Sequence, residues 1–249
     1  MTKPTPLYTM QSSVQDSDTD FRRRQKLSSM FRMFQDIAAL HAANLGASVK
    51  RLHEELNVAW ILMRVRIEID RYPVLSQELT VETWPQAPRA LYDRDYMLRD
   101  LENNALVRAA STWVIMDLGT REIKRDKFLD YCGLEMNKER SLGRSLGKLK
   151  QVPNAKLAYE KRIQFSDVDY NIHVNNAKYV DFVMDAFSFD EHRKGVIKAF
   201  EINYVNEIGP GEVIHIKRKP LGDGIEYVEG MRKIDKALVF NAIAEWEDA

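Results

Sequence analysis

The length, composition and charge of the chain exclude several classes of protein. Its 249 residues allow one large domain or two of about half that length, and 45% hydrophobic with 30% charged residues is the usage of folded rather than disordered proteins. Because 37 Lys and Arg balance 37 Asp and Glu, no whole-chain field favours nucleic acid or an anionic membrane, and we expect neither as a partner.

The amino-terminal segment and the single cysteine bear on the compartment. Residues 1–11 lack the apolar run of a secretory signal, and the longest apolar stretch, near 58–63, is far shorter than the ~20 residues that span a bilayer. Cys132 has no second cysteine for an intramolecular disulfide or a multi-cysteine zinc site. We therefore expect a cytoplasmic protein without a membrane span.

The first half of the chain predicts one long helix followed by strands. Apolar residues recur at mostly three- and four-residue spacing over 27–45, ahead of Gly46, which is the pattern of an amphipathic helix of about five turns. Over 63–70 apolar and charged residues alternate, as in a strand with one buried face. Further strands are expected over 77–84, 92–99 and 107–118.

A linker and a second, similar set of elements follow. Residues 137–150 are rich in Lys, Arg, Ser and Gly, so a linker over 137–154 is expected to join two modules, 1–136 and 155–249. A second helical pattern covers 174–187. Strands are expected over 198–204, 212–219, 225–231 and 237–246.

A short internal repeat relates the two halves. Residues 17–21 (SDTDF) match residues 166–170 (SDVDY), 149 positions later, and each copy precedes a helical pattern. An amphipathic helix cannot bury its apolar face alone, and consecutive antiparallel strands present one apolar face. Each half is therefore expected to wrap a sheet around its helix.

The second copy of the repeat carries a cluster of reactive side chains. Asp169, Asn171 and His173 occupy alternate positions just before the helical pattern. A carboxylate can orient its neighbours, an amide can donate to an oxyanion or position a water, and an imidazole can donate to a carbonyl or transfer a proton. The first copy has arginines in place of Asn171 and His173, which predicts a single active site in the second half. Taken alone, such residues also serve as turn formers and helix caps.

Three segments together resemble the acyl carrier protein (ACP) thioesterases of plants and bacteria. They are residues 169–179 (DYNIHVNNAKY), 83–85 (TWP) and 110–118 (ASTWVIMDL), within a similarity that covers roughly 5–247. The resemblance implies an α+β fold, the tandem or double hotdog, in which each module is a curved antiparallel sheet wrapped around a long central helix. It also implies that the first module, with a degenerate site, holds the acyl chain and that the second holds the catalytic residues.

The resemblance implies that the catalytic residues are Asp169, Asn171, His173 and Glu207. Plant members commonly have a cysteine directly after the Glu, but Ile208 stands here, which argues against a thiol nucleophile. The expected reaction is hydrolysis of fatty acyl-ACP to free fatty acid and ACP by an activated water. Glu207 would be the general base or would hold the water with Asn171. His173 would stabilise the oxyanion, and Asp169 would keep its neighbours in register. No cofactor or metal is implied.

Several alternatives stay open at this point. The chain could be an acyl-CoA thioesterase of the same fold, a non-catalytic acyl-binding protein, or a hotdog hydratase, which is less favoured because such proteins show a Pro soon after the Asn and Ile172 follows Asn171 here. Basic residues over 22–26 and 138–156 could contact an acidic carrier or belong to a solvated surface. Both a monomer and a homodimer are compatible with tandem modules.

Overall fold

The computed structural model describes residues 3–87, 91–124, 129 and 131–248. The chain divides into two compact units. The first module comprises residues 1–65 and 69–146, and the second module comprises residues 66–68 and 147–249. The change from one to the other at residue 146 falls inside the segment 137–154 that the sequence predicts as a linker.

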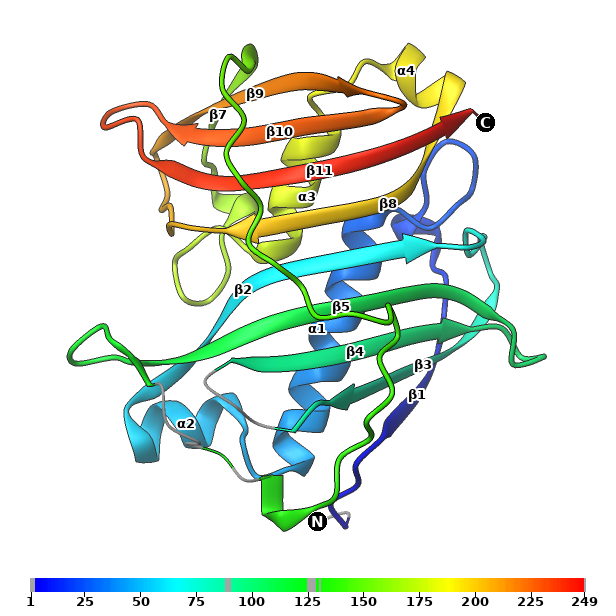
Figure 1. Ribbon diagram of the computed structural model, residues 1–249, viewed down its shortest axis with the longest axis vertical. Coiled ribbons are helices and arrows are strands. Elements are labelled where there is room, and N and C mark those ends of the chain that lie inside the picture. Colours follow the sequence, from blue (N-terminus) through cyan, green and yellow to red (C-terminus); the bar gives the residue numbers. More distant parts are fainter. Residues whose placement is uncertain (1–2, 88–90, 125–128, 130, 249) are drawn as a thin grey trace. The chain divides into compact units, whose positions relative to one another are not determined.

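The first module consists of a sheet and two helices (Figure 1). Its strands follow the order β1-β3-β4-β5-β2, with β6 on β5, and the pairs β1/β3, β3/β4 and β4/β5 are antiparallel. The strands are β1 Tyr8–Ser13, β2 Val58–Ile69, β3 Glu78–Pro85, β4 Tyr92–Arg99, β5 Ala105–Asp117 and β6 Ile123–Lys124. The helices are α1 Leu27–Asn44 and α2 Val49–Leu56.

The long helix α1 packs on the sheet through the apolar residues that recur every three or four positions. Met30, Phe34 and Ile37 are buried, and the Phe34 ring lies 4.9 Å from the ring of Tyr96 on β4. The helix ends just before Gly46, whose φ of 73° lies in the left-handed region that glycine adopts readily. The length and position of this helix agree with the pattern in the sequence.

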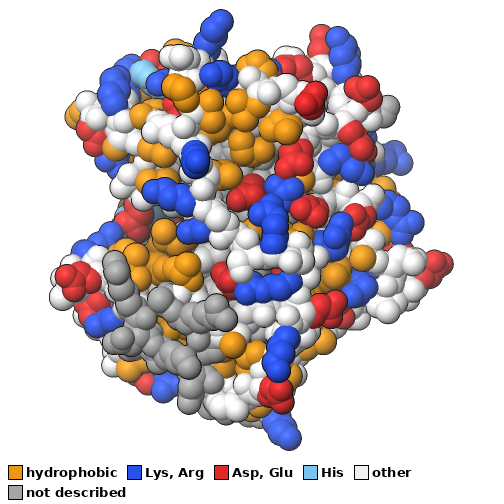
Figure 2. Space-filling view, viewed as in Figure 1, with side chains coloured by type: hydrophobic (Ala, Val, Ile, Leu, Met, Phe, Trp, Pro, Cys, Tyr) orange, Lys and Arg blue, Asp and Glu red, His pale blue; other side chains and the backbone are white. Residues whose placement is uncertain are grey.

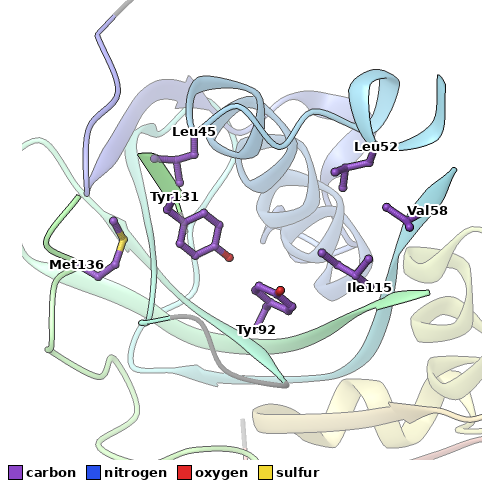
Figure 3. Close-up of a cluster of buried hydrophobic side chains, with 7 residues drawn as sticks. All are labelled: Leu45, Leu52, Val58, Tyr92, Ile115, Tyr131 and Met136. Atoms are coloured by element: carbon purple, nitrogen blue, oxygen red, sulfur yellow. The ribbon is translucent and has the colours of Figure 1, made fainter. Parts of the chain in front are cut away.

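A second apolar cluster lies where α1 and α2 meet the strands (Figure 3). The Tyr92 ring makes an edge contact with Trp60, at 5.1 Å between centroids, and another with Tyr131 at 6.3 Å. The buried members are Leu45, Leu52, Val58, Tyr92, Ile115, Tyr131 and Met136. This cluster holds residues 131–136, which follow the strands, against the rest of the first module.

The second module repeats the plan with shorter helices. Its strands follow the order β8-β11-β10-β9-β7, with every adjacent pair antiparallel. The strands are β7 Lys156–Arg162, β8 Gly195–Tyr204, β9 Val213–Gly222, β10 Ile225–Arg232 and β11 Leu238–Asp248, and the helices are α3 Asn176–Met184 and α4 Phe189–Lys194. Val180 and Val183 of α3 are fully buried, and Tyr179 packs on Phe240 of β11 at 5.4 Å.

The second helix is shorter than its pattern predicts. Expected over 174–187, α3 begins after Asn175, whose side chain accepts a hydrogen bond from the backbone N–H of Ala177 at 2.9 Å, and it ends at Met184. A separate helix, α4, then starts at a capping box in which Ser188 and Glu191 bond to each other's backbone. The apolar spacing continues past Met184 to Phe187, so the sequence predicts a longer helix than α3 and gives no sign of α4.

The start of the predicted linker is anchored on the first module by a buried carboxylate. Asp95 Oδ1 accepts hydrogen bonds from the backbone N–H and hydroxyl of Ser141, at 2.9 and 2.8 Å, and its Oδ2 accepts one from Gln86 Nε2 at 2.8 Å. The Trp84 indole N–H donates to the carbonyl of Glu139 at 2.8 Å. The segment is therefore fixed where it leaves the first module. Within the described ranges, no helix has both the length and the apolar character needed to cross a membrane.

Candidate active site

The residues at 168–174 form a tight loop in the second module, closed by backbone hydrogen bonds. The N–H of Asp169 donates to the carbonyl of His173 at 2.9 Å, and the N–H of Ile172 donates to the carbonyl of Asp169 at 3.0 Å. Asp169 Oδ1 also accepts the N–H of Asn171 at 2.9 Å, which is an Asx turn. Ile172 takes a positive φ of 62° to complete the loop. Asp169 thus fixes the backbone that carries Asn171 and His173.

The loop is joined to the segment that follows β8. The N–H of Val174 donates to the carbonyl of Ile208 at 3.1 Å, which brings His173 beside Glu207. His173 Nε2 lies 3.8 Å from Glu207 Oε2, and the two side chains are 42% and 40% exposed. This separation exceeds a direct hydrogen bond but lets one water molecule contact both groups. The pair can therefore hold a nucleophilic water.

Arg232, at the end of β10, supports the segment that carries Glu207. Its Nη2 donates to the carbonyl of Glu207 at 2.7 Å, and its Nε lies 3.1 Å from Glu212 Oε1. Glu212 Oε2 in turn accepts the backbone N–H of Gly209 at 2.6 Å. Arg232 and Glu212 together hold the backbone on both sides of Ile208, which is buried. No sequence motif pointed to either residue.

Two tyrosines, buried Tyr179 and half-buried Tyr204, contact the start of α3 or belong to it. The Tyr204 hydroxyl donates to the carbonyl of Asn176, the first residue of α3, at 3.0 Å, and the Tyr179 ring lies 5.5 Å from that of Tyr204. Burial raises the pKa of Tyr179, and the negative charges of Glu207, Glu212 and Asp169 raise it further. Burial also raises the pKa of Tyr204. Both phenols therefore stay neutral at physiological pH and support the start of α3.

The structure brings the predicted residues together only in part. His173 and Glu207 face each other, whereas Asp169 acts on the backbone of the same loop. The Asn171 side chain is exposed, and its amide has no hydrogen-bond partner among the described residues. It is therefore free to donate to a bound substrate. Cys132 lies in the short helix Tyr131–Gly133, and its side chain falls outside the described residues. The described ranges contain no group of three or more His, Cys, Asp or Glu side chains placed to hold a metal ion.

The first module contains the same loop without the reactive side chains. The N–H of Asp20 donates to the carbonyl of Arg24 at 2.8 Å, as Asp169 does to His173. The N–H of Gln25 donates to the carbonyl of Pro73, as Val174 does to Ile208, which makes Tyr72 the counterpart of Glu207.

The side chains at these counterpart positions make a stable contact of their own. The Arg24 guanidinium lies over the Tyr72 ring, 4.6 Å from its centroid, and forms an ion pair with Asp20 at 3.1 Å. The repeat therefore keeps the backbone of the loop, but Arg24 and Tyr72 stand where the second module has His173 and Glu207.

Each module has the hotdog architecture, which is a sheet with a central helix, and in both modules the same type of loop precedes that helix. Two such modules in tandem define a double hotdog fold. An acyl-ACP thioesterase from Bacteroides thetaiotaomicron has the same fold, with a TM-score of 0.89, 22% identity, and coverage of 99% of this chain and 100% of that one. The 12:0-ACP thioesterase from Umbellularia californica matches with a TM-score of 0.87 and 20% identity, over 98% of each chain.

Sequence comparison gives the family. Residues 6–127 match the acyl-ACP thioesterase N-terminal domain, and residues 150–242 match the C-terminal domain. The chain belongs to the acyl-ACP thioesterase family. It is 25% identical over 227 residues to oleoyl-acyl carrier protein thioesterase 2, chloroplastic, of Arabidopsis thaliana, covering 81% of this chain and 59% of the relative. It is 24% identical over 219 residues to the palmitoyl-acyl carrier protein thioesterase of the same plant, covering 81% and 52%. The chain thus spans a little over half the length of the curated relatives it matches.

Proposed function

We propose that the protein hydrolyses the thioester of fatty acyl-ACP to free fatty acid and ACP by attack of an activated water. The observation that carries this proposal is the pair His173 and Glu207, which lie 3.8 Å apart within the residues that match the acyl-ACP thioesterase C-terminal domain. Glu207 is the general base. The reaction needs no thiol, because buried Ile208 follows the glutamate where plant relatives commonly have cysteine.

The chemical steps follow from this geometry. Glu207 takes a proton from the water as the water oxygen bonds to the thioester carbonyl carbon, and the carbonyl electrons move to the oxygen. Collapse of the tetrahedral intermediate reforms the carbonyl and breaks the carbon–sulfur bond. The protonated Glu207 then returns its proton to the departing thiolate. The products are a carboxylic acid and the free thiol of the carrier.

Three groups near the loop can stabilise the oxyanion. The free amide of Asn171 and the imidazole of His173 both donate hydrogen bonds. The N–H of Asn176, at the start of α3, has no acceptor among the described residues, and the helix dipole adds positive potential there. Asp169 contributes indirectly, because it fixes the loop.

The division of labour between the modules is part of the proposal. Residues 155–249 supply the catalytic groups, residues 1–136 hold the acyl chain and 137–154 link the two. The Arg24 and Tyr72 contact supports a degenerate site in the first module, since neither side chain can act there as His173 and Glu207 do. We infer a reducing compartment such as the cytoplasm from the single cysteine.

Some of the basic side chains that could contact the acidic carrier are already paired with carboxylates. On the face shown in Figure 2, Lys and Arg side chains are interspersed with Asp and Glu. Arg24 and Arg140 are engaged with Asp20 and Asp93. Exposed Arg23 and Lys26 are the better candidates. Changing both to Glu should slow acyl-ACP hydrolysis more than acyl-CoA hydrolysis, and an equal loss on both substrates would count against this contact.

The central test is a panel of acyl-ACPs of increasing chain length, with matched acyl-CoAs, assayed for release of thiol and fatty acid. We expect release of both products in equal amounts, with ACP the better carrier, and unchanged turnover in Cys132→Ala. Faster hydrolysis of acyl-CoA would make the protein an acyl-CoA thioesterase. Binding without release would make it an acyl-binding protein. The same samples, run in sedimentation, would distinguish monomer from homodimer.

A further inference from the structure

A groove of about 660 Å³ opens in the first module between β1 and the exposed side of α1. Four consecutive residues of β1, from Met10 to Ser13, contribute to its wall, and Met33 and Asp36 contribute from α1. Successive side chains of a strand point to opposite faces of the sheet. A groove that contacts four consecutive residues must therefore run along the edge of the strand. The backbone of β1 therefore borders the groove.

That edge of β1 is open. β1 is the last strand in its sheet and pairs only with β3 in the described part of the chain. The N–H of Val14 donates to the carbonyl of Gln77, so in this register the even-numbered residues of β1 bond to β3. The N–H and C=O groups of Thr9 and Gln11 then point away from β3. They have no hydrogen-bond partner among the described residues.

The matching place in the second module is filled. Tyr159 and Lys161 of β7 stand 149 positions after Met10 and Ser12. The Tyr159 hydroxyl donates to the carbonyl of Phe182 in α3 at 2.7 Å, and Lys161 Nζ lies 4.9 Å from the Phe182 ring centroid. Shorter side chains at the first-module positions make no such bridge to α1. The groove is thus a difference between two related modules, and not a general property of the fold.

The groove is acidic. Its wall includes the carboxylates of Asp18, Asp36 and Glu78 and one guanidinium, that of Arg32, which pairs with Asp18. Arg32 also attracts Asp36 electrostatically without forming an ion pair with it, and no ion pair is found for Glu78 among the described residues. A negative field disfavours an acyl carrier or any other anion here. It also disfavours a second copy of this chain pairing through β1, because like charges would meet.

We propose that this groove binds an extended, basic segment of another polypeptide. The segment adds as a strand to the open edge of β1, bonding to the backbone of Thr9 and Gln11, and places a Lys or Arg side chain against Asp36 and Glu78. The groove belongs to the first module and the proposed catalytic residues belong to the second, so this proposal does not rest on the proposed function.

The test uses a fluorescent heptapeptide, Thr-Lys-Thr-Lys-Thr-Lys-Thr, and its counterpart with Glu in place of Lys. The full chain should bind the Lys peptide at least about tenfold more tightly than the Glu peptide, with affinity that falls as salt rises. Gln11→Pro removes an N–H that the β1/β3 ladder does not use, and should weaken binding about tenfold. The control Gln11→Val keeps the N–H and should bind as the wild type does.

Two further variants test the charge and the space. Ser12→Lys installs the residue that the second module has at the matching position, and the pair Asp36→Asn with Glu78→Gln removes the two carboxylates that face the bound Lys or Arg. Both should abolish binding while acyl thioester hydrolysis stays unchanged. Equal binding of the two peptides, no binding of either, or full binding by Gln11→Pro would overturn the proposal. The proposal would also fail if spermidine displaced the Lys peptide and Gln11→Pro did not change peptide binding. It would fail as well if the wild type were a dimer that Gln11→Pro dissociates.

Discussion

His173 and Glu207 come from different segments of the second module, yet Nε2 and Oε2 lie 3.8 Å apart because one backbone hydrogen bond, from Val174 to Ile208, joins those segments. The same bond in the first module, from Gln25 to Pro73, brings Arg24 over Tyr72. In both modules the backbone therefore brings the same two positions together. Whether this pair of positions can activate water depends on the side chains that occupy them.

Glu207→Gln tests the base directly. Glutamine keeps the size of the side chain but cannot take a proton from water, so kcat on acyl-ACP should fall by about 10²- to 10⁴-fold with little change in KM. The measurement is the steady-state rate of thiol release. Glu102→Gln, in an exposed turn of the first module, is the matched control and should keep full turnover. A folded Glu207→Gln protein with near wild-type kcat would remove Glu207 from the role of base.

Arg232 should act on turnover through the position of Glu207. Its hydrogen bond to the Glu207 carbonyl and its pairing with Glu212 hold that segment, so Arg232→Met should lower kcat by about 10- to 100-fold through a small displacement of the carboxylate. In a Glu207→Gln background the same change should cost no further activity, because the group it positions is already lost.

This double-mutant cycle separates positioning from general destabilisation. A purely structural loss would reduce turnover by the same factor in both backgrounds and would lower the midpoint of thermal unfolding in parallel. Additive losses would therefore refute the positioning role of Arg232 and leave the role of Glu207 as base untouched.

The regular elements could be predicted well where one periodicity dominates. The helix expected over 27–45 is α1 Leu27–Asn44, and the strand expected over 92–99 is β4 Tyr92–Arg99. The helix predicted over 174–187 is longer than α3. Asn175 and Ser188 each start a helix by local capping, and the apolar spacing does not show this.

The sequence predicts only those site residues that lie close together along the chain. The spacing of Asp169, Asn171 and His173 indicates a reactive loop, but Glu207 was identified through a family resemblance. No motif in the sequence points to Arg232, which donates a hydrogen bond to the carbonyl of Glu207. Their proximity depends on strand register and on one hydrogen bond between distant segments, and neither leaves a short motif.

Asp95→Asn should release the start of the linker. The carboxylate accepts two hydrogen bonds from Ser141 and one from Gln86 while fully buried, and an amide cannot accept all three. We expect a loss of about 1–3 kcal/mol in the free energy of unfolding, and faster tryptic cleavage after Arg140. Digestion time courses followed by mass spectrometry measure this, with Glu102→Gln, in an exposed turn of the first module, as the control. Unchanged cleavage would show that the apolar contacts alone hold the segment.

His41 should make the stability of the first module depend on pH. Its Nδ1 lies 3.0 Å from Nη1 of buried Arg94, and its Nε2 lies 2.8 Å from the carbonyl of Thr5. Because arginine only donates, Nδ1 must be unprotonated, and the single ring proton on Nε2 is donated to Thr5. Protonation of the ring would place a second positive charge against Arg94 in the interior.

Burial, reinforced by the charge of Arg94, lowers the pKa of His41 from 6.5 to about 4. Between these two pKa values the unfolded chain binds a proton at His41 and the folded chain does not. The contribution of His41 to the free energy of unfolding is therefore fully present above pH 6.5, and about 3 kcal/mol of it is lost as the pH falls from 6.5 towards 4. Urea unfolding of the wild type and of His41→Gln between about pH 7.5 and pH 4.5 measures the effect, since the other titrating groups cancel in the difference between the two proteins. Glutamine can accept from Arg94 and donate to Thr5 without titrating, so the variant should lose less stability over this range. Parallel curves for the two proteins would mean that His41 takes up its proton as readily in the folded chain as in the unfolded one.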